Sequence, residues 1–212
     1  MFGFNDLAYM HWYEEEVNRI EAEKKSLSYQ PEMVFYGSSS IRLWDNLYND
    51  FRKFLPVNLG FGGSTLEACV WYFDRIMEDF SPEHIVVYAG DNDLGDGKLP
   101  KEVFTYFGEL SSCIREKFND VSFSFISIKP SLARWNINHL INDTNTLIKN
   151  AIKQQGSLSY YVDVYEKMVD ERGYPLRHLF ESDGLHLNEA GYSVWKETLL
   201  THFSLNNDIF IT

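Results

Sequence analysis

Basic residues, cysteine and long apolar runs are scarce in this sequence, and each shortage excludes a class of protein. Its 19 lysines and arginines face 31 aspartates and glutamates, so the net charge at pH 7 is −12. A charge of this sign repels phosphate backbones and anionic lipid, and we therefore expect neither nucleic acid nor a membrane as a partner. No apolar run approaches the ~20 residues that are needed to span a bilayer.

The shortage of cysteine points to a reducing compartment. Cys69 and Cys113 are the two cysteines, and both fall in segments with a helical pattern, where we expect buried free thiols. Glu14, Glu15 and Glu16 occupy a region that would be apolar in a signal peptide, so no export signal is expected. These features predict a cytoplasmic protein.

Apolar residues, by contrast, are plentiful enough for a large core. They make up 44% of the 212 residues and include 16 Phe, 13 Tyr and 5 Trp. This composition excludes a disordered chain. Because no internal repeat, low-complexity tract or linker divides the sequence, we predict a single domain over residues 1–212.

Strand-like and helix-like segments alternate along the chain. An amphipathic helix is predicted at about residues 5–25, where apolar residues recur at steps of 3 and 4. Apolar runs typical of strands lie at 33–36, 57–59, 85–89, 121–128 and 160–164, and helical patterns lie at 65–80, 101–118, 143–154 and 189–203. The alternation predicts right-handed βαβ units and a parallel sheet covered by helices on both faces.

Polar or glycine-rich loops follow three of these strands, and a fourth precedes the last helix. They read GSSS at 37–40, GFGGST at 60–65, GDND at 90–93 and DGLH at 183–186. Each alone has an ordinary structural explanation, because glycines make turns, serines cap helices and an Asp–x–x–His pair can form a surface turn. Ligands of such sheets bind at the carboxyl ends of the strands, however, so the four loops together favour a functional site.

Parts of these loops resemble cofactor-binding motifs, but each lacks a residue that the motif requires. Thr65 stands where a dinucleotide fingerprint has its third glycine, and no Walker-type motif occurs. The stretch DNDLGDG resembles a calcium loop, but Gly95 stands where a ligand is needed and Asp96 where the sharp turn needs glycine. The six histidines lack the paired spacing of zinc ligands. We therefore expect no metal and no organic cofactor.

The remaining residues suit nucleophilic catalysis by serine. A serine nucleophile needs a base, and the base needs a carboxylate to fix its tautomer. His186 and Asp183 are three residues apart on a turn, close enough for one to orient the other. An oxyanion would need N–H donors already in place, and the backbone of Gly63 and the amide of Asn92 fit this role.

Of the three serines at 38–40, Ser39 is predicted to be the nucleophile. Gly37 makes the turn after the strand and a helix is expected to begin near Ser40, so Ser39 lies at the junction. There its N–H is one of the unpaired donors of a helix N-terminus. Ser38 lies too near the turn to share these donors, and Ser40, ~100° further around the helix, is expected to face away from His186.

Four blocks of the sequence resemble the SGNH (GDSL-type) hydrolase superfamily. They are FYGSSSIRLW, VNLGFGGSTL, VVYAGDNDL and DGLHLNEAGY, and they span residues 35–192. The resemblance implies an α/β fold, a flavodoxin-like three-layer αβα sandwich with a five-stranded parallel sheet. It also implies a catalytic triad of Ser39, Asp183 and His186, with Ser39, Gly63 and Asn92 as oxyanion donors.

The first block departs from the family pattern, because Ser38 replaces the usual aspartate before the nucleophile. This aligns the chain with a subgroup that carries GSSSIR, in which SIKPSLARW at 127–135 also resembles a family stretch. Arg134 or Trp135 would then line the acyl or alcohol pocket; alternatively, both belong to a surface loop.

We expect a serine esterase that hydrolyses small-molecule carboxylic esters through an acyl-enzyme. Because the resembling family lacks a large lid, short acyl chains are expected, with acetyl groups on a carbohydrate as one case. Two alternatives stay open. One is thioesterase or lysophospholipase-like activity on longer chains, and the other is a catalytically silent acyl- or glycan-binding protein on the same fold.

Overall fold

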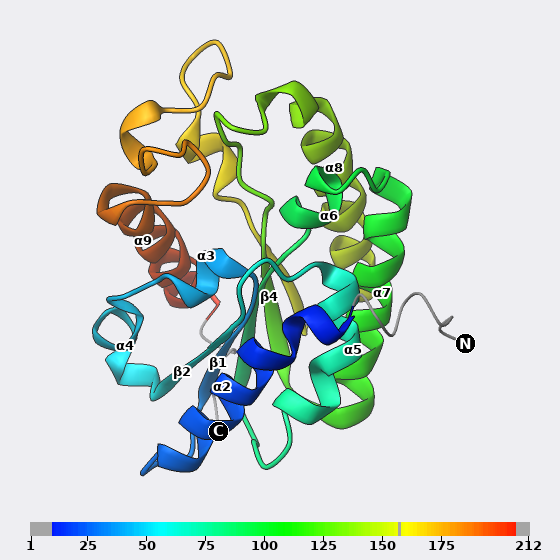
Figure 1. Ribbon diagram of the computed structural model, residues 1–212, viewed down its shortest axis with the longest axis vertical. Helices are drawn as coiled ribbons and strands as arrows, with labels where there is room; N and C mark the ends of the chain where they lie inside the picture. The colour runs from blue at the N-terminus through cyan, green and yellow to red at the C-terminus, as the bar shows by residue number, and fades with distance from the viewer. Residues whose placement is uncertain (1–9, 157, 207–212) are drawn as a thin grey trace.

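Five parallel strands form one sheet in the order β2-β1-β3-β4-β5, in a computed structural model that describes residues 10–156 and 158–206. The strands are β1 (Met33–Gly37), β2 (Pro56–Gly60), β3 (His84–Tyr88), β4 (Ser122–Ile126) and β5 (Ser159–Val162). All five predicted strands are present, with small shifts at their ends. The predicted parallel sheet and three-layer αβα architecture are confirmed (Figure 1).

Helices cover both faces of the sheet (Figure 1). One face packs against α2 (Glu14–Ser26), α5 (Leu66–Ile76), α7 (Pro100–Lys117) and α8 (Asn138–Gln155). The other packs against α3 (Ser39–Arg42), α4 (Leu47–Asp50) and α9 (Glu189–Leu205). Strand alternation explains the two cores: Val34 and Tyr36 of β1 point into the first, and Met33 and Phe35 into the second. Parallel strands buried on both faces read as near-continuous apolar runs, as β1 (MVFYG) and most of β3 (HIVVY) do here.

Short elements complete the chain. The helix α6 (Asp91–Gly95) follows β3, and single 3₁₀ turns are η1 (His11–Tyr13), η2 (Arg52–Phe54), η3 (Trp135–Ile137), η4 (Tyr165–Met168) and η5 (Arg177–Leu179). The helix predicted at 143–154 begins earlier, at Asn138, because the η3 turn leads directly into it. Its first turn carries the apolar residues Leu140 and Ile141, which pack on the core and which the predicted helix left out.

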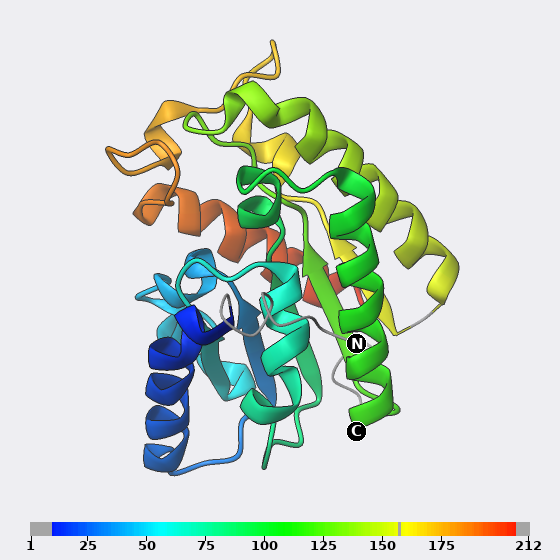
Figure 2. The ribbon, with the colours of Figure 1, turned by 45° about the vertical axis from the view of Figure 1, so that its right-hand side comes forward.

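The predicted N-terminal helix is present as η1 followed by α2, and its part before residue 10 lies outside the described residues. Figure 2 shows α2 lying beside α5 along the sheet. The cysteines lie in α5 and α7 and both are free, but Cys113 is only half-buried, unlike Cys69.

Within residues 10–156 and 158–206, no helix is both long and apolar enough to cross a membrane. The cytoplasmic location and the single domain over residues 1–212 stay predictions.

Strand register brings the loops at the carboxyl edge together. Gly37 at the end of β1 pairs with Gly60 of β2 on one side and with Tyr88 of β3 on the other. Position 37 requires glycine, because its φ is +136° and a Cβ there would lie 1.9 Å from the carbonyl oxygen of Tyr88. The three strands therefore end level, and the loops that follow them begin side by side.

Candidate active site

Ser39 lies where β1, an interior strand of the sheet, is followed by a helix. It is the first residue of α3, with Ser38 as the extended residue before the helix. A residue at this position has a backbone N–H with no acceptor within its own helix, so the N–H is available to an anion. The observed start of the helix is one residue earlier than predicted, and the strand-to-helix junction falls at Ser39 as expected.

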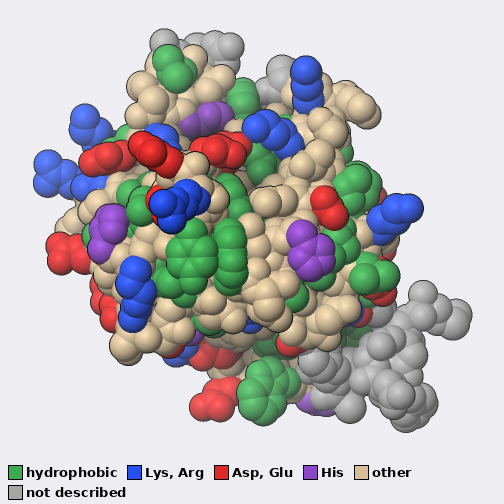
Figure 3. Space-filling model, turned by 90° about the horizontal axis from the view of Figure 1, so that it is seen from above, with side chains coloured by type: hydrophobic (Ala, Val, Ile, Leu, Met, Phe, Trp, Pro, Cys, Tyr) green, Lys and Arg blue, Asp and Glu red, His purple; other side chains and the backbone are tan. Residues whose placement is uncertain are grey.

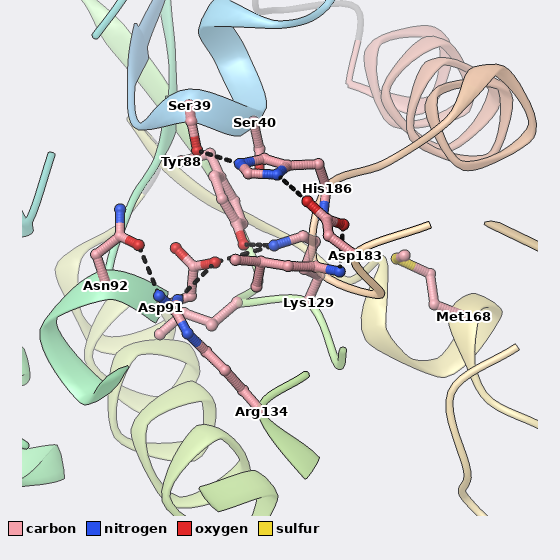
Figure 4. Close-up of polar contacts among 12 residues, drawn as sticks. Ser39, Ser40, Tyr88, Asp91, Asn92, Lys129, Arg134, Met168, Asp183 and His186 are labelled. Atoms are coloured by element: carbon pink, nitrogen blue, oxygen red, sulfur yellow. Dashed lines mark hydrogen bonds and ion pairs between the residues drawn. The ribbon is translucent and has the colours of Figure 1, made fainter. Parts of the chain in front are cut away.

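Ser39, His186 and Asp183 form a continuous polar chain (Figure 4). The Oγ of Ser39 is 3.3 Å from Nε2 of His186, and Nδ1 of His186 is 2.6 Å from Oδ2 of Asp183. The other carboxylate oxygen, Oδ1, accepts the backbone N–H groups of Leu185 and His186 at 2.8 and 3.0 Å. The long first contact is usual for an unliganded site, where catalytic hydrogen bonds tighten when substrate binds.

The turn around Asp183 keeps this carboxylate ionised. Burial acts to raise the pKa of Asp183, but the N–H of Leu185 and the hydrogen bonds with His186 lower the pKa to about 2. An ionised carboxylate accepts a proton-bearing Nδ1, which leaves the lone pair of Nε2 facing Ser39. The geometry therefore places an imidazole in the tautomer that can take the proton of the serine.

The two neighbouring serines have different surroundings. Ser38 and Ser40 are 0% and 2% exposed. Within the described part of the chain, the Oγ of Ser38 has no hydrogen-bond partner, and the hydroxyl of Ser40 faces that of Tyr88, where burial raises the pKa of Tyr88 and Ser40 acts to lower it. Of the three hydroxyls, the structure places that of Ser39 against the imidazole.

Gly63 lies in the loop after β2 and Asn92 is the second residue of α6 after β3, and β2 and β3 are the two strands that flank β1. The Nδ2 of Asn92 donates one hydrogen bond to the carbonyl of Ser64 at 3.0 Å, so its second N–H remains for another acceptor. Gly63 has a φ of +69°, and a Cβ there would meet no atom within 4 Å, so the space beside it is open. Asn92 therefore keeps one N–H for a further acceptor, and a small group could approach Gly63.

Comparison with known proteins decides the family. The model of the GDSL-like Lipase/Acylhydrolase family matches residues 34–194. The chain belongs to this family. As a GDSL-like acylhydrolase, it is an ester hydrolase, in agreement with the resemblance found in its four blocks.

Similar proteins of known structure share the fold. A GDSL-like lipase from Bacteroides thetaiotaomicron superposes with a TM-score of 0.74 and 20% identity, over 89% of this chain and 97% of the other. A carbohydrate esterase family 3 structure from Talaromyces cellulolyticus has a TM-score of 0.68 and 15% identity, over 83% and 98%.

A curated relative, an N-acylneuraminate cytidylyltransferase from Escherichia coli, is 24% identical over 190 residues. The match covers 86% of this chain but only 42% of that protein.

The GDSL-like site also contains a buried ionic cluster, which sequence reasoning missed. Lys129 donates to Oδ2 of Asp91 at 2.9 Å, and these side chains are 1% and 7% exposed. Arg134 makes a second ion pair with the same oxygen at 3.2 Å and donates to Oδ1 of Asn92 at 2.9 Å. A signal was present in the sequence, since Lys129 is a lone charge directly after an apolar strand.

Trp135, the other predicted pocket residue, packs edge-on against Tyr174, with ring centroids 4.8 Å apart.

The N-terminal helix contacts the loop that carries Gly63. Because Gly63 is a predicted oxyanion donor, this loop (residues 60–64) is called the oxyanion loop below. Arg19 donates to the carbonyl of Gly60 at 2.9 Å. Glu16 accepts the N–H of Gly62 at 2.9 Å, and the hydroxyl of Tyr13 donates to the carbonyl of Gly63 at 3.3 Å. The sequence held no signal for these contacts, because charged residues on the polar face of an amphipathic helix usually face water.

A further hydrogen bond holds the chain just after the oxyanion loop, where α5 begins. Both carboxylate oxygens of Asp93 accept the N–H of Leu66 at the start of α5, at 3.1 and 2.9 Å. Burial raises the pKa of Asp93 to about 7, although the N–H of Leu66 lowers it. This bond joins α6, which carries Asn92, to the start of α5, which directly follows the loop that carries Gly63. It therefore limits how far these two segments can move apart.

A cleft of about 560 Å³ opens beside His186. Its lining is mostly polar and includes the side chains of Asp45, Asn46, Asp50, Glu181, Asn188, Glu189, Tyr192 and Lys196, together with the apolar Leu43, Trp44 and Leu187. Figure 3 shows acidic and basic side chains interspersed with apolar ones on the face seen from above. In residues 10–156 and 158–206, no three His, Cys, Asp or Glu side chains are grouped so that they could hold a metal ion.

Proposed function

We propose that this ester hydrolase is a serine esterase that removes short acyl groups, in particular acetyl groups, from a hydroxyl-rich small molecule such as a carbohydrate. The observation that carries the proposal is the chain of contacts from Ser39 through His186 to Asp183 at the carboxyl edge of the sheet. A nucleophile, a base and an orienting carboxylate are the parts that acyl transfer to water requires.

The proposed reaction proceeds in two halves. The Oγ of Ser39 attacks the ester carbonyl while Nε2 of His186 takes the hydroxyl proton, and the N–H groups of Ser39, Gly63 and Asn92 stabilise the oxyanion. Collapse of this intermediate expels the alcohol, which receives the proton from His186. Water then attacks the acyl-enzyme with His186 again as base, and the carboxylic acid and free Ser39 are released.

The polar cleft supports a hydroxyl-rich alcohol. Because His186 returns its proton to the leaving alcohol, that part of the substrate must lie on the His186 side, where the cleft opens. Carboxylate and amide oxygens such as those of Glu181 and Asn46 accept hydrogen bonds from sugar hydroxyls. The names of two similar proteins, a carbohydrate esterase and an N-acylneuraminate cytidylyltransferase, also refer to sugars. We propose a small-molecule ester of this class as the partner.

The short loops around Ser39 support a short acyl group. Residues 61–65 join β2 to α5, and residues 89–90 join β3 to α6, so neither connection forms a lid over the serine. A site without a lid offers little apolar surface to a long acyl chain, and longer chains would gain little binding energy there.

The test is a series of p-nitrophenyl esters with acyl chains from two to twelve carbons, together with release of acetate from acetylated sugars. We expect the highest kcat/KM with the acetyl ester and no turnover above background by Ser39→Ala. A maximum at long chains would favour the thioesterase or lysophospholipase alternative. Wild-type protein that is folded but inactive on all these esters would favour the silent binding protein.

The cleft can be tested separately. Glu181→Gln should raise KM for an acetylated sugar several-fold and leave p-nitrophenyl acetate unaffected, because the latter has no hydroxyl groups to bind. Glu171, an exposed acid outside the cleft, provides the matched control Glu171→Gln, which should change neither substrate. Equal effects of Glu181→Gln on both substrates would place the sugar elsewhere.

A further inference from the structure

The amide of Asn92 is held from both sides. Its Nδ2 donates to the carbonyl of Ser64, and its Oδ1 accepts a hydrogen bond from Nη2 of Arg134 at 2.9 Å. Figure 4 shows the amide oxygen facing Arg134 and the amide nitrogen on the opposite side. A guanidinium group has donors only, so a flipped amide would bring its NH₂ group against N–H donors of Arg134. The flipped orientation would also present an oxygen, and not an N–H, to the oxyanion.

Arg134 is itself fixed in place. Its Nη1 lies 3.2 Å from Oδ2 of Asp91, and Lys129 binds the same oxygen from the other side. Burial acts to raise the pKa of Asp91, but the charges of Lys129 and Arg134 outweigh burial and hold the pKa below its ordinary value. The guanidinium also lies against Gly95, where a Cβ would be 2.8 Å from Cζ. Asp91 and Gly95 are the first and last residues of α6, which also carries Asn92.

We propose that Arg134 is a positioning residue that fixes the amide orientation of Asn92, with Asp91 and Lys129 holding the guanidinium in place. This inference rests on the proposed function, in which Asn92 donates to the oxyanion. It assigns to Arg134 a role other than lining the substrate pocket, because two of its nitrogen atoms already bind Asp91 and Asn92. Its side chain is also only 19% exposed.

The test is a double-mutant cycle between Arg134 and Asn92. Arg134→Met keeps the length of the side chain and removes its donors, and kcat should fall ~10- to 100-fold with KM changed less than about threefold, as for a catalytic group displaced by about 1 Å. In the Asn92→Ala background, Arg134→Met should cost less than about twofold, since it then has no amide to orient. Arg134→Lys keeps the charge but not the two-pronged geometry and should be intermediate.

A second variant perturbs Arg134 without replacing it. Gly95→Ala places a methyl group against the guanidinium, which must shift because it is the flexible end of a side chain. We expect a lowered kcat with Tm within a few degrees of the wild type, since alanine favours a helix while the displaced guanidinium weakens its ion pair with Asp91. Arg115 is the matched control: it binds the carbonyls of Val121 and Leu158 just before β4 and β5, at the opposite edge of the sheet. Arg115→Met should lower Tm and leave the kcat of the folded protein unchanged.

The outcomes separate this inference from the proposed function. If Ser39→Ala hydrolysed p-nitrophenyl acetate as well as the wild type, the proposed function itself would be wrong. If hydrolysis depended on Ser39 but the losses from Arg134→Met and Asn92→Ala multiplied, or if Arg134→Met acted mainly on KM, only the positioning role would be overturned.

Discussion

Replacing Asp183 by asparagine changes one hydrogen-bonding atom and should reverse the tautomer of His186. The side-chain oxygen of asparagine can keep the backbone N–H groups that Oδ1 of Asp183 accepts at 2.8 and 3.0 Å. Its NH₂ group then takes the place of Oδ2 and donates to Nδ1 of the imidazole. Nε2 must carry the proton, and it can no longer accept the proton of Ser39.

The expected loss follows from this reversal and from the exposure of the pair. The same substitution in a serine protease lowers kcat by ~10⁴ with the geometry intact. Here the side chains of Asp183 and His186 are 46% and 33% exposed, so water can partly replace the lost acceptor. We therefore expect kcat for p-nitrophenyl acetate to fall ~10³-fold or more for Asp183→Asn, with KM little changed.

Thermal denaturation supplies the control. Asp183→Asn should keep the wild-type Tm within a few degrees, whereas Asp183→Ala removes the acceptor of two backbone N–H groups and should lower Tm further. A loss in kcat of less than tenfold would show that another group orients His186. Equal destabilisation by the two variants would show that asparagine does not preserve the turn, and the change in kcat could not then be assigned to the tautomer.

Three further predictions concern the nucleophile, the pH dependence and the N-terminal helix. Ser39→Ala should lower kcat by ~10⁴-fold or more, and Ser38→Ala and Ser40→Ala should stay within about tenfold of the wild type; a fluorophosphonate that labelled Ser38 or Ser40 would contradict the assignment. Because the pKa of Asp183 is held at about 2, its charge is present throughout the working range and is lost only as pH falls toward that value. The rise of kcat/KM with pH should therefore follow one proton, that of the imidazole, and a flat profile from pH ~5 to ~9 would argue against a histidine base. Glu16→Ala should lower kcat about fivefold through the oxyanion loop, as expected for one hydrogen bond, and Glu16→Gln, which keeps an acceptor, should recover most of it; equal losses would mean that the charge matters and not the acceptor.

The sequence predicted those parts of the site that depend on local chain geometry. Asp183 and His186 are three residues apart on one turn, and Ser39 comes two residues after a strand whose end can be read from its apolar pattern. The order of strands and loops then places these residues at one edge of a parallel sheet, because the carboxyl ends of such strands lie together. None of these features depends on contacts between polar side chains that are far apart in the sequence.

The contacts that sequence reasoning missed join residues far apart in the chain. Arg134 and Asn92 are 42 positions apart, and Glu16 and Gly62 are 46 apart. Many arginines and glutamates could serve in such contacts, and a charged side chain gives the same sequence pattern whether it faces water or a buried partner. Arg134 was accordingly predicted as a pocket residue or an exposed loop residue, whereas the structure places it against Asn92 and Asp91.

The helix α2 has a practical consequence for any attempt to isolate or transplant this domain. The family match begins at residue 34, after the helix has ended at Ser26. A fragment cut at that boundary would keep the serine, the histidine and the aspartate, but it would lose every partner that Tyr13, Glu16 and Arg19 offer to the oxyanion loop. It would also lose Val17 and Ile20, which are fully buried in the first core, so such a fragment, or a chimaera built from it, should be less stable as well as slower to turn over.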